Sequence, residues 1–159
     1  MLGSLLLTGL SAGLFCAWSI SVIPGTLKIN DMTYLTTMQS INRAILNPLF
    51  FMVFFGSPIL LAISTIAHYG GQQQLFVLLI SALLVYLIGT IGVTGLGNVP
   101  LNDQLEALVL DEQRSDQLAT FRRHYEDKWN RLHQIRTICT LIAFGLIAMA
   151  VLKYSKEGV

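Results

Sequence analysis

The fold is decided by an uncharged stretch in the middle of the chain, residues 75–97, LFVLLISALLVYLIGTIGVTGLG. A helix needs about 20 apolar residues, at 1.5 Å rise per residue, to cross the hydrocarbon core of a bilayer. Every backbone polar group in lipid must be hydrogen-bonded, and a lone segment achieves this only as a helix. Residues 75–97 therefore predict a transmembrane α-helix.

Three other apolar stretches surround this one. Residues 2–23 and residues 44–67 also contain no charged side chain. The last stretch, residues 137–152, is shorter, but its apolar pattern reaches back to Leu132 and so places His133 and Arg136 at the membrane edge. We expect an all-α fold, an integral membrane four-helix bundle that forms a single membrane domain over residues 1–159. The expected spans are about 2–23, 47–68, 75–97 and 132–152.

The composition supports a membrane protein and excludes several other classes. The chain has 159 residues, of which 53% are hydrophobic and 12% are charged, whereas an average soluble domain has about 25% charged residues. These values exclude a disordered chain, a nucleic-acid-binding arm and an ordinary cytosolic enzyme. The first stretch has no Lys or Arg before Lys28 and is long for the apolar part of a signal peptide. We therefore expect it to be a helix of the mature protein.

Two polar segments, residues 30–46 and 100–131, are also expected to be helical. Asn30 and Asp31 are N-cap residue types, and the apolar residues that follow them recur at helical spacing. A second apolar stripe runs through the later segment, with a break expected near residues 111–115. The two segments predict a helical cap over one side of the bundle.

The distribution of basic residues predicts an orientation in the membrane. Four crossings place both termini on one side, together with Lys153 and Lys156, and place the two polar segments on the other side. The side with the polar segments, counted over residues 24–43 and 98–136, contains the remaining basic residues: Lys28, Arg43, Arg114, Arg122, Arg123, Lys128, Arg131 and Arg136. Because cytoplasmic loops carry an excess of Lys and Arg, the polar loops are expected in the cytoplasm and both termini outside.

A polar motif lies where the third span ends. In Asn98-Val99-Pro100-Leu101-Asn102 the two carboxamides share one helix face, and a proline can free backbone carbonyls. The motif is compatible with a polar binding surface. The spacing alone favours a helix stop followed by a new helix start, with the asparagines as caps.

A second group of polar residues begins the fourth span. Trp129, His133 and Arg136 lie along one helical stripe. An Arg at the membrane edge either reaches lipid phosphates or turns inward to a polar partner, so these residues are either interfacial anchors or part of a site. The topology places them on the same side as the two asparagines and as Gln39 and Asn42. We expect Asn98, Asn102 and Arg136 within mutual hydrogen-bonding reach around one cavity.

No cofactor or metal site is predicted. The chain has no zinc spacing of Cys and His, no EF-hand and no Glu-xx-His pattern. His68 and His133 are expected at opposite ends of the bundle, which disfavours a shared haem. No Asp or Glu lies in an expected span, and this weakens a role as a transporter subunit.

Three motifs together resemble the anthrone-oxygenase-like family of four-span membrane proteins. These are Met38-Gln39-Ser40-Ile41-Asn42-Arg43 before Asn47-Pro48, then Asn98-Val99-Pro100-Leu101-Asn102, then Trp129 with His133, Arg136 and Thr137. The resemblance implies oxidation of anthrones to anthraquinones by molecular oxygen, without an obvious cofactor. By position it transfers site roles to Gln39, Asn42, Asn98, Asn102, Trp129 and Arg136. His133 stands where relatives are expected to have Asn or His.

The leading hypothesis is a cofactor-independent oxygenase acting on an anthrone-like or phenolic hydrophobic compound. Arg136 and His133 are the expected catalytic residues, Arg136 as the group that stabilises an anion and His133 as the proton acceptor. The expected substrate-binding residues are Gln39, Asn42, Asn98, Asn102 and Trp129. The alternative is a non-enzymatic membrane module that binds a lipid or quinone or supports a partner protein. The expected partners are the bilayer and a hydrophobic small molecule or lipid, with no nucleic acid; a homo-oligomer stays open.

Overall fold

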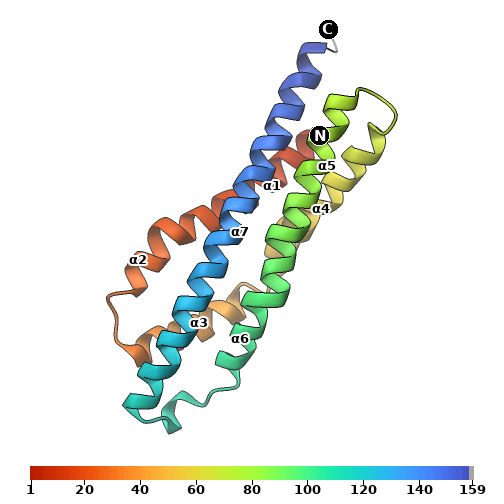
Figure 1. Ribbon diagram of the computed structural model, residues 1–159. Coiled ribbons are helices and arrows are strands. Elements are labelled where there is room, and N and C mark those ends of the chain that lie inside the picture. Colours follow the sequence, from red (N-terminus) through yellow and green to blue (C-terminus); the bar gives the residue numbers. More distant parts are fainter. Residues whose placement is uncertain (158–159) are drawn as a thin grey trace.

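The computed structural model describes residues 1–157, and every regular element in that part of the chain is a helix (Figure 1). The all-α fold class is thereby confirmed. The α-helices are α1 (Leu2–Ala17), α2 (Ile23–Thr26), α3 (Asp31–Ala44), α4 (Pro48–Ala67), α5 (Gln73–Tyr86), α6 (Val99–Glu106) and α7 (Ser115–Glu157). Three segments with wider, π-type turns are η1 (Trp18–Val22), η2 (Leu87–Gly92) and η3 (Thr94–Asn98), and η4 (Leu110–Glu112) is a short 3₁₀ turn.

Four continuous helices are long and apolar enough to cross a membrane. They cover Leu2–Thr26, Pro48–Ala67, Gln73–Glu106 and Ser115–Lys156. Between 22% and 39% of the most apolar window of each helix is buried inside the molecule, so most of this apolar surface faces outward. Leu2, Leu6 and Leu10, for example, form one exposed stripe along α1. Since such a surface is stable only in lipid, the chain is an integral, multi-pass membrane protein.

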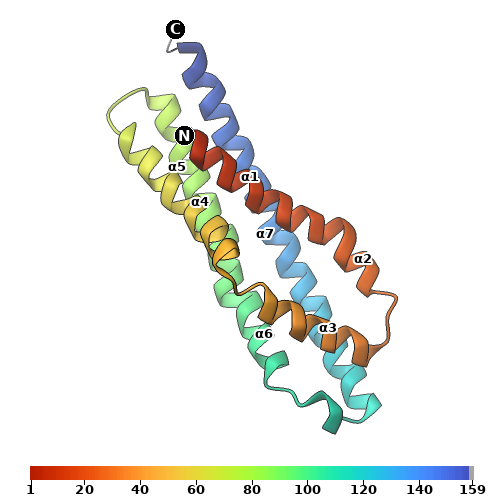
Figure 2. The same cartoon turned by 180° about the vertical axis from the view of Figure 1, so that it is seen from behind.

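The helical cap occupies one end of the bundle. Both termini and the link from α4 to α5 lie at the opposite end (Figure 1), and the view from behind shows α3 beside α6 and the lower part of α7 (Figure 2). Buried apolar residues from these three helices, among them Leu35, Met38, Leu105 and Tyr125, form a core of their own. The cap is therefore a packed layer rather than a set of loops.

The first and third membrane helices extend further than their apolar stretches indicate. The first helix continues through η1 as far as Thr26, and the third runs through Pro100 into α6 without a stop. The proline is accommodated beside a wide turn, in which the Val99 N–H bonds to the Thr94 carbonyl five residues earlier. The motif at residues 98–102 is thus neither a helix stop nor a capped helix start.

Hydrogen bonds between helices hold the membrane end together. Ser4 pairs with Ser64 at 2.9 Å and Thr90 pairs with Thr140 at 2.8 Å between their hydroxyl oxygens. Pro58 lies inside α4 and cannot donate to the Phe54 carbonyl. The Tyr86 hydroxyl fills this position by donating to the Phe54 carbonyl oxygen at 3.0 Å. Such bonds suit a lipid environment, where water cannot satisfy polar groups.

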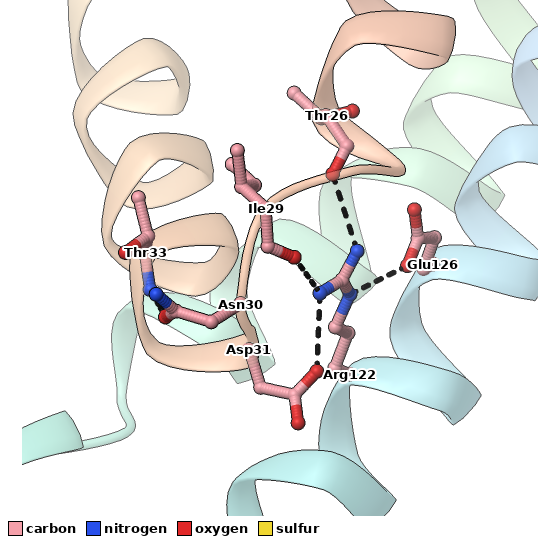
Figure 3. A network of polar contacts seen from close by, with 7 residues as sticks. All are labelled: Thr26, Ile29, Asn30, Asp31, Thr33, Arg122 and Glu126. Atoms are coloured by element: carbon pink, nitrogen blue, oxygen red, sulfur yellow. Dashed lines mark hydrogen bonds and ion pairs between the residues drawn. The ribbon is translucent and has the colours of Figure 1, made fainter.

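Arg122 of α7 fastens the cap to the first membrane helix (Figure 3). Its guanidinium donates to the carbonyl oxygens of Thr26 and Ile29, at 3.2 and 2.6 Å. It also forms ion pairs with Asp31 at 3.0 Å and Glu126 at 2.8 Å. The guanidinium carbon lies 4.4 Å from the centre of the Tyr34 ring, and burial together with the Glu126 carboxylate raises the pKa of the Tyr34 hydroxyl. We call these contacts of Arg122 the latch.

Candidate functional site

The candidate site is a cavity of about 190 Å³ between the membrane helices and the cap. Residues from the first helix, from α3 and α4, from the third helix and from α7 all contribute to its wall. The lining residues are Leu14, Phe15, Trp18, Ile41, Asn42, Ile45, Leu46, Phe50, Thr94, Asn98, Val99, Asn102, Asp103, Trp129, His133 and Arg136. Most of the wall is apolar and aromatic, with a few polar groups, as is usual for small-molecule sites.

Arg136 is the buried charged residue of this wall, with 8% of its surface exposed. Among residues 1–157 no carboxylate forms an ion pair with it. Its guanidinium carbon lies 4.7 Å from the centre of the Phe15 ring and 5.1 Å from that of Trp129. These cation–π contacts offset part of the cost of burying the charge, but an uncompensated buried cation still costs several kcal/mol.

His133 holds the guanidinium in place. Arg136 donates to His133 Nδ1 from Nε at 3.1 Å and from Nη2 at 3.0 Å. The other ring nitrogen, Nε2, lies 3.1 Å from the Phe15 carbonyl oxygen, which can only accept. This pattern assigns the neutral ring with its proton on Nε2. Both ring nitrogens are therefore engaged by the protein, and His133 is fully buried.

Aromatic rings cover one side of this pair. Trp129 stacks on His133 with ring centres 5.1 Å apart and planes 8° apart, and Trp18 packs against Trp129 at 5.6 Å. Asn102 fixes the orientation of the Trp129 ring, because its Oδ1 accepts from Trp129 Nε1 at 2.8 Å. The same oxygen accepts from the Tyr125 hydroxyl at 3.1 Å. Asn102 is thus engaged mainly in holding the wall.

Asn98 has only one of its polar atoms paired. Its Nδ2 donates to the main-chain oxygen of Trp129 at 3.2 Å, while Oδ1 is buried without a hydrogen-bond partner. The structure differs here from the sequence-based expectation. Asn98, Asn102 and Arg136 line one cavity but do not bond to one another, since each is turned to a partner on α7.

The two candidate residues of α3 have different surroundings. Asn42 lines the cavity and donates from Nδ2 to the Tyr125 hydroxyl at 3.3 Å. Gln39 does not line it, and its side-chain Nε2 donates to the carbonyl oxygens of Leu105 and Leu108 at 2.8 and 3.1 Å. Gln39 caps the end of α6 and joins it to α3. The observed contacts give it a structural position outside the cavity wall.

Sequence reasoning missed several wall residues. Phe15 and Trp18 lie in an apolar stretch whose pattern predicts a membrane span and nothing further. The Trp within this stretch is the one feature that could have indicated a binding site. Thr94, whose hydroxyl oxygen lies 3.4 Å from Arg136 Nη1, gave no signal at all. Asp103 places a carboxylate at the exposed edge of the wall, one residue beyond the asparagine motif. The wide turns η1 and η3, which bring Trp18, Thr94 and Asn98 into the wall, are features that recur at functional sites.

Metal ligation finds no support in the arrangement of side chains. Within residues 1–157, no three or more His, Cys, Asp or Glu residues lie close enough together to hold a metal ion. His68 is at the far end of the bundle, where its ring packs against Tyr154 at 5.6 Å. The donors around the cavity are instead an arginine, carboxamides and hydroxyls, which bind oxygen atoms of organic ligands.

Comparison with known proteins identifies the family of the chain. The model of the family described as anthrone oxygenase matches residues 49–146, which is more than half of the chain. The matched region contains Asn98, Asn102, Trp129, His133 and Arg136 of the cavity wall. No curated protein and no solved structure matches the chain. The family match begins at the start of the second membrane helix, includes the third and extends into the fourth up to residue 146, and the chain therefore belongs to the anthrone oxygenase family.

Proposed function

We propose that the protein is a membrane oxygenase that oxidises an anthrone-like or phenolic compound in the cavity described above, with Arg136 stabilising the substrate anion. The observation that carries this proposal is the buried Arg136 guanidinium, which has no carboxylate partner in the described part of the chain. A guanidinium has five N–H groups, and the protein contacts of Arg136 leave one N–H free on each terminal nitrogen. An anionic ligand oxygen supplies the missing counter-charge.

The size and the wall of the cavity favour a compact ring compound over a long lipid. The volume of about 190 Å³ is below the roughly 300–1,000 Å³ of sites for drug-sized ligands. Phe15, Phe50 and the two tryptophans provide ring surfaces for an aromatic ligand. Leu14 and Leu46, which are 40% and 64% exposed, lie at the edge of the wall and give an apolar compound a path from the bilayer.

The proposed reaction converts anthrone and one O₂ into anthraquinone and one water. A proton leaves the methylene carbon of anthrone, and the resulting enolate oxygen lies against Arg136. The electron-rich carbon of the enolate reduces O₂ and bonds to it, and the peroxide takes up the proton. Loss of water from this hydroperoxide breaks the O–O bond and the remaining C–H bond and leaves the second carbonyl. The protein supplies orientation and a preorganised positive charge at the developing oxyanion.

The proposed role of His133 depends on Arg136. The lone pair of the neutral ring is on Nδ1 and is occupied by two Arg136 contacts. His133 accepts a substrate proton only when the guanidinium moves from Nδ1 to the substrate oxygen. This couples the proton transfer to the arrival of the group that stabilises the anion.

The decisive experiment removes the charge of Arg136 and keeps a polar side chain at this position. We expect Arg136→Gln to slow anthrone oxidation by about 10²–10³-fold, the usual loss when one preorganised oxyanion donor is removed. Oxygen uptake and anthraquinone absorbance are measured with purified protein in micelles, after subtraction of the rate in empty micelles. Arg131→Gln is the matched control, because Arg131 is an exposed arginine on the same helix, and it is expected to retain the wild-type rate.

A wild-type rate in folded Arg136→Gln would disprove the proposed mechanism. If wild-type protein binds anthrones but oxidises none, the non-enzymatic binding module takes the place of the oxygenase. Thermal melting of each variant in the same micelles establishes that it is folded.

We also propose that the cap faces the cytoplasm. Eight of the ten Lys and Arg residues lie within residues 24–43 and 98–136, on the side of the cap, and the positive-inside rule places such regions in the cytoplasm. In this orientation both termini lie outside.

A further inference from the structure

The Asn98 amide has an acceptor that the protein leaves unused. Asn98 is 1% exposed and lines the cavity. Of the buried side-chain atoms without a hydrogen-bond partner in the described chain, Thr8 Oγ1, Asn98 Oδ1 and Glu126 Oε1, only that of Asn98 belongs to this wall. An unpaired buried acceptor costs about 1–3 kcal/mol, so its position beside a cavity calls for a donor.

The chemistry of its neighbour fixes which atom of the amide is free. The main-chain oxygen of Trp129 can only accept, so the Asn98 amide turns its Nδ2 towards it. Oδ1 is then held as an acceptor by a bond that a ligand does not disturb. The nearby Asn102 shows the opposite case, because its Oδ1 already accepts two hydrogen bonds.

The free donors and the free acceptor of the wall complement each other. Arg136 offers N–H groups to a ligand oxygen that accepts, whereas Asn98 Oδ1 requires a ligand group that donates. Aromatic and aliphatic side chains line the cavity around both residues. A ligand with one anionic or carbonyl oxygen and one separate hydroxyl satisfies both residues, and a ligand without the hydroxyl leaves Asn98 unpaired.

We propose that Asn98 is a specificity-determining residue, whose Oδ1 accepts a hydrogen bond from a ring hydroxyl and selects hydroxylated aromatic ligands over the same rings without a hydroxyl. This inference rests on the proposed ligand site. The inference gives the two asparagines of the motif different roles, since Asn98 binds the ligand hydroxyl and Asn102 orients the Trp129 ring.

The chain contains its own probe for the test. Both of its tryptophans, Trp18 and Trp129, line the cavity, so quenching of tryptophan fluorescence reports occupation of this site. The ligand pair is 2-hydroxyanthraquinone and 2-methylanthraquinone, which are similar in size and differ in the donor. Neither has the methylene carbon of an anthrone, so binding is measured without turnover, at a pH at which the hydroxyl is protonated.

We expect the purified wild-type protein to bind the hydroxy compound about tenfold to a hundredfold more tightly than the methyl compound, as the cost of one unpaired buried acceptor implies. In Asn98→Leu the ratio of the two dissociation constants is expected to fall to about one, so that the whole preference is lost. Gln134→Leu is the matched amide-to-leucine control at an exposed position of α7 and is expected to keep the wild-type ratio. If Asn98→Leu does not fold, Asn98→Ala is measured in the same way.

Equal affinity of the wild-type protein for both compounds overturns the inference, and so does a preference that survives in the folded Asn98 variant. These outcomes are distinct from failure of the oxygenase proposal. Arg136-dependent anthrone oxidation without a hydroxyl preference overturns only the role of Asn98. A hydroxyl preference that depends on Asn98, in a protein that oxidises no anthrone, supports this inference and overturns only the oxygenase.

Discussion

At the scale of single residues, the site is organised by pairs in which one side chain restricts another. His133 restricts Arg136, and the Phe15 carbonyl in turn fixes the proton of His133 on Nε2. Asn102 restricts Trp129, which stacks on His133. Such support lets a guanidinium keep its position before a ligand arrives, which is the condition for electrostatic stabilisation of an anion.

Asn102→Leu tests this support, because Asn102 orients the Trp129 ring. The substitution leaves the Trp129 Nε1–H and the Tyr125 hydroxyl without their shared acceptor, and we expect a loss of about 2–3 kcal/mol in unfolding free energy. Denaturant titration in micelles, followed by circular dichroism, measures the change. Gln104→Leu, at an exposed position of α6, is the control and is expected to stay within about 0.5 kcal/mol of wild type. An equal effect of both variants would contradict the support role.

At the scale of elements, wide helical turns and close contacts between helices position the side chains of the cavity wall. The turns η1 and η3 lie where the first and third helices pass the cavity. The third helix also approaches α7 closely, because a Cβ added at Gly89 would overlap the Cβ and Sγ atoms of Cys139. Glycine at this position lets the two helices that hold Thr94 and Arg136 lie side by side, as is common for membrane helices with small interface residues.

The latch, formed by the contacts of Arg122, fixes the cap against the first helix. Arg122→Met would leave the Asp31 and Glu126 carboxylates and two carbonyls without their cation (Figure 3). Of the two carboxylate residues, Glu126 is the buried one. We expect a loss of about 3–5 kcal/mol, typical of a broken buried ion pair. We also expect faster proteolysis of the link at residues 27–30. Thermal melting and limited proteolysis in micelles measure the two effects.

Arg123→Met is the matched control for the latch, because Arg123 is the exposed neighbour on the same helix. It is expected to change stability by less than about 0.5 kcal/mol. If Arg122→Met melted like Arg123→Met, the network in Figure 3 would not be what fastens the cap.

At the scale of the whole molecule, the orientation proposed for the cap is open to a direct test. Cys16 and Cys139 are replaced by Ala, and single cysteines are introduced at Gln72, in the link from α4 to α5, and at Gln113, between η4 and α7. In intact cells of a bacterial host we expect an impermeant maleimide to label the cysteine at position 72 and not that at position 113. After permeabilisation both should react. The reverse pattern would invert the proposed topology.

The sequence by itself determined the membrane helices, the helical cap and the family. The requirement that backbone groups be paired in lipid is local, so each apolar stretch specifies a helix wherever it lies. The order of the four spans also indicated that the polar candidates lie at one end of the bundle, because successive crossings end on alternate sides of the membrane. Even so, the apolar stretches did not reveal that the third helix continues through Pro100.

Only the tertiary structure decided how the candidate residues divide their roles. It turned Gln39 onto carbonyls of the cap, engaged Asn102 with Trp129 and Tyr125, and left Asn98 Oδ1 and part of Arg136 unused. It also brought Phe15 and Trp18 of the first helix against His133, more than a hundred residues away in the chain. Helical spacing specifies which side chains share a face, but the face that turns inward depends on how neighbouring helices pack and on each extra residue in a wide turn.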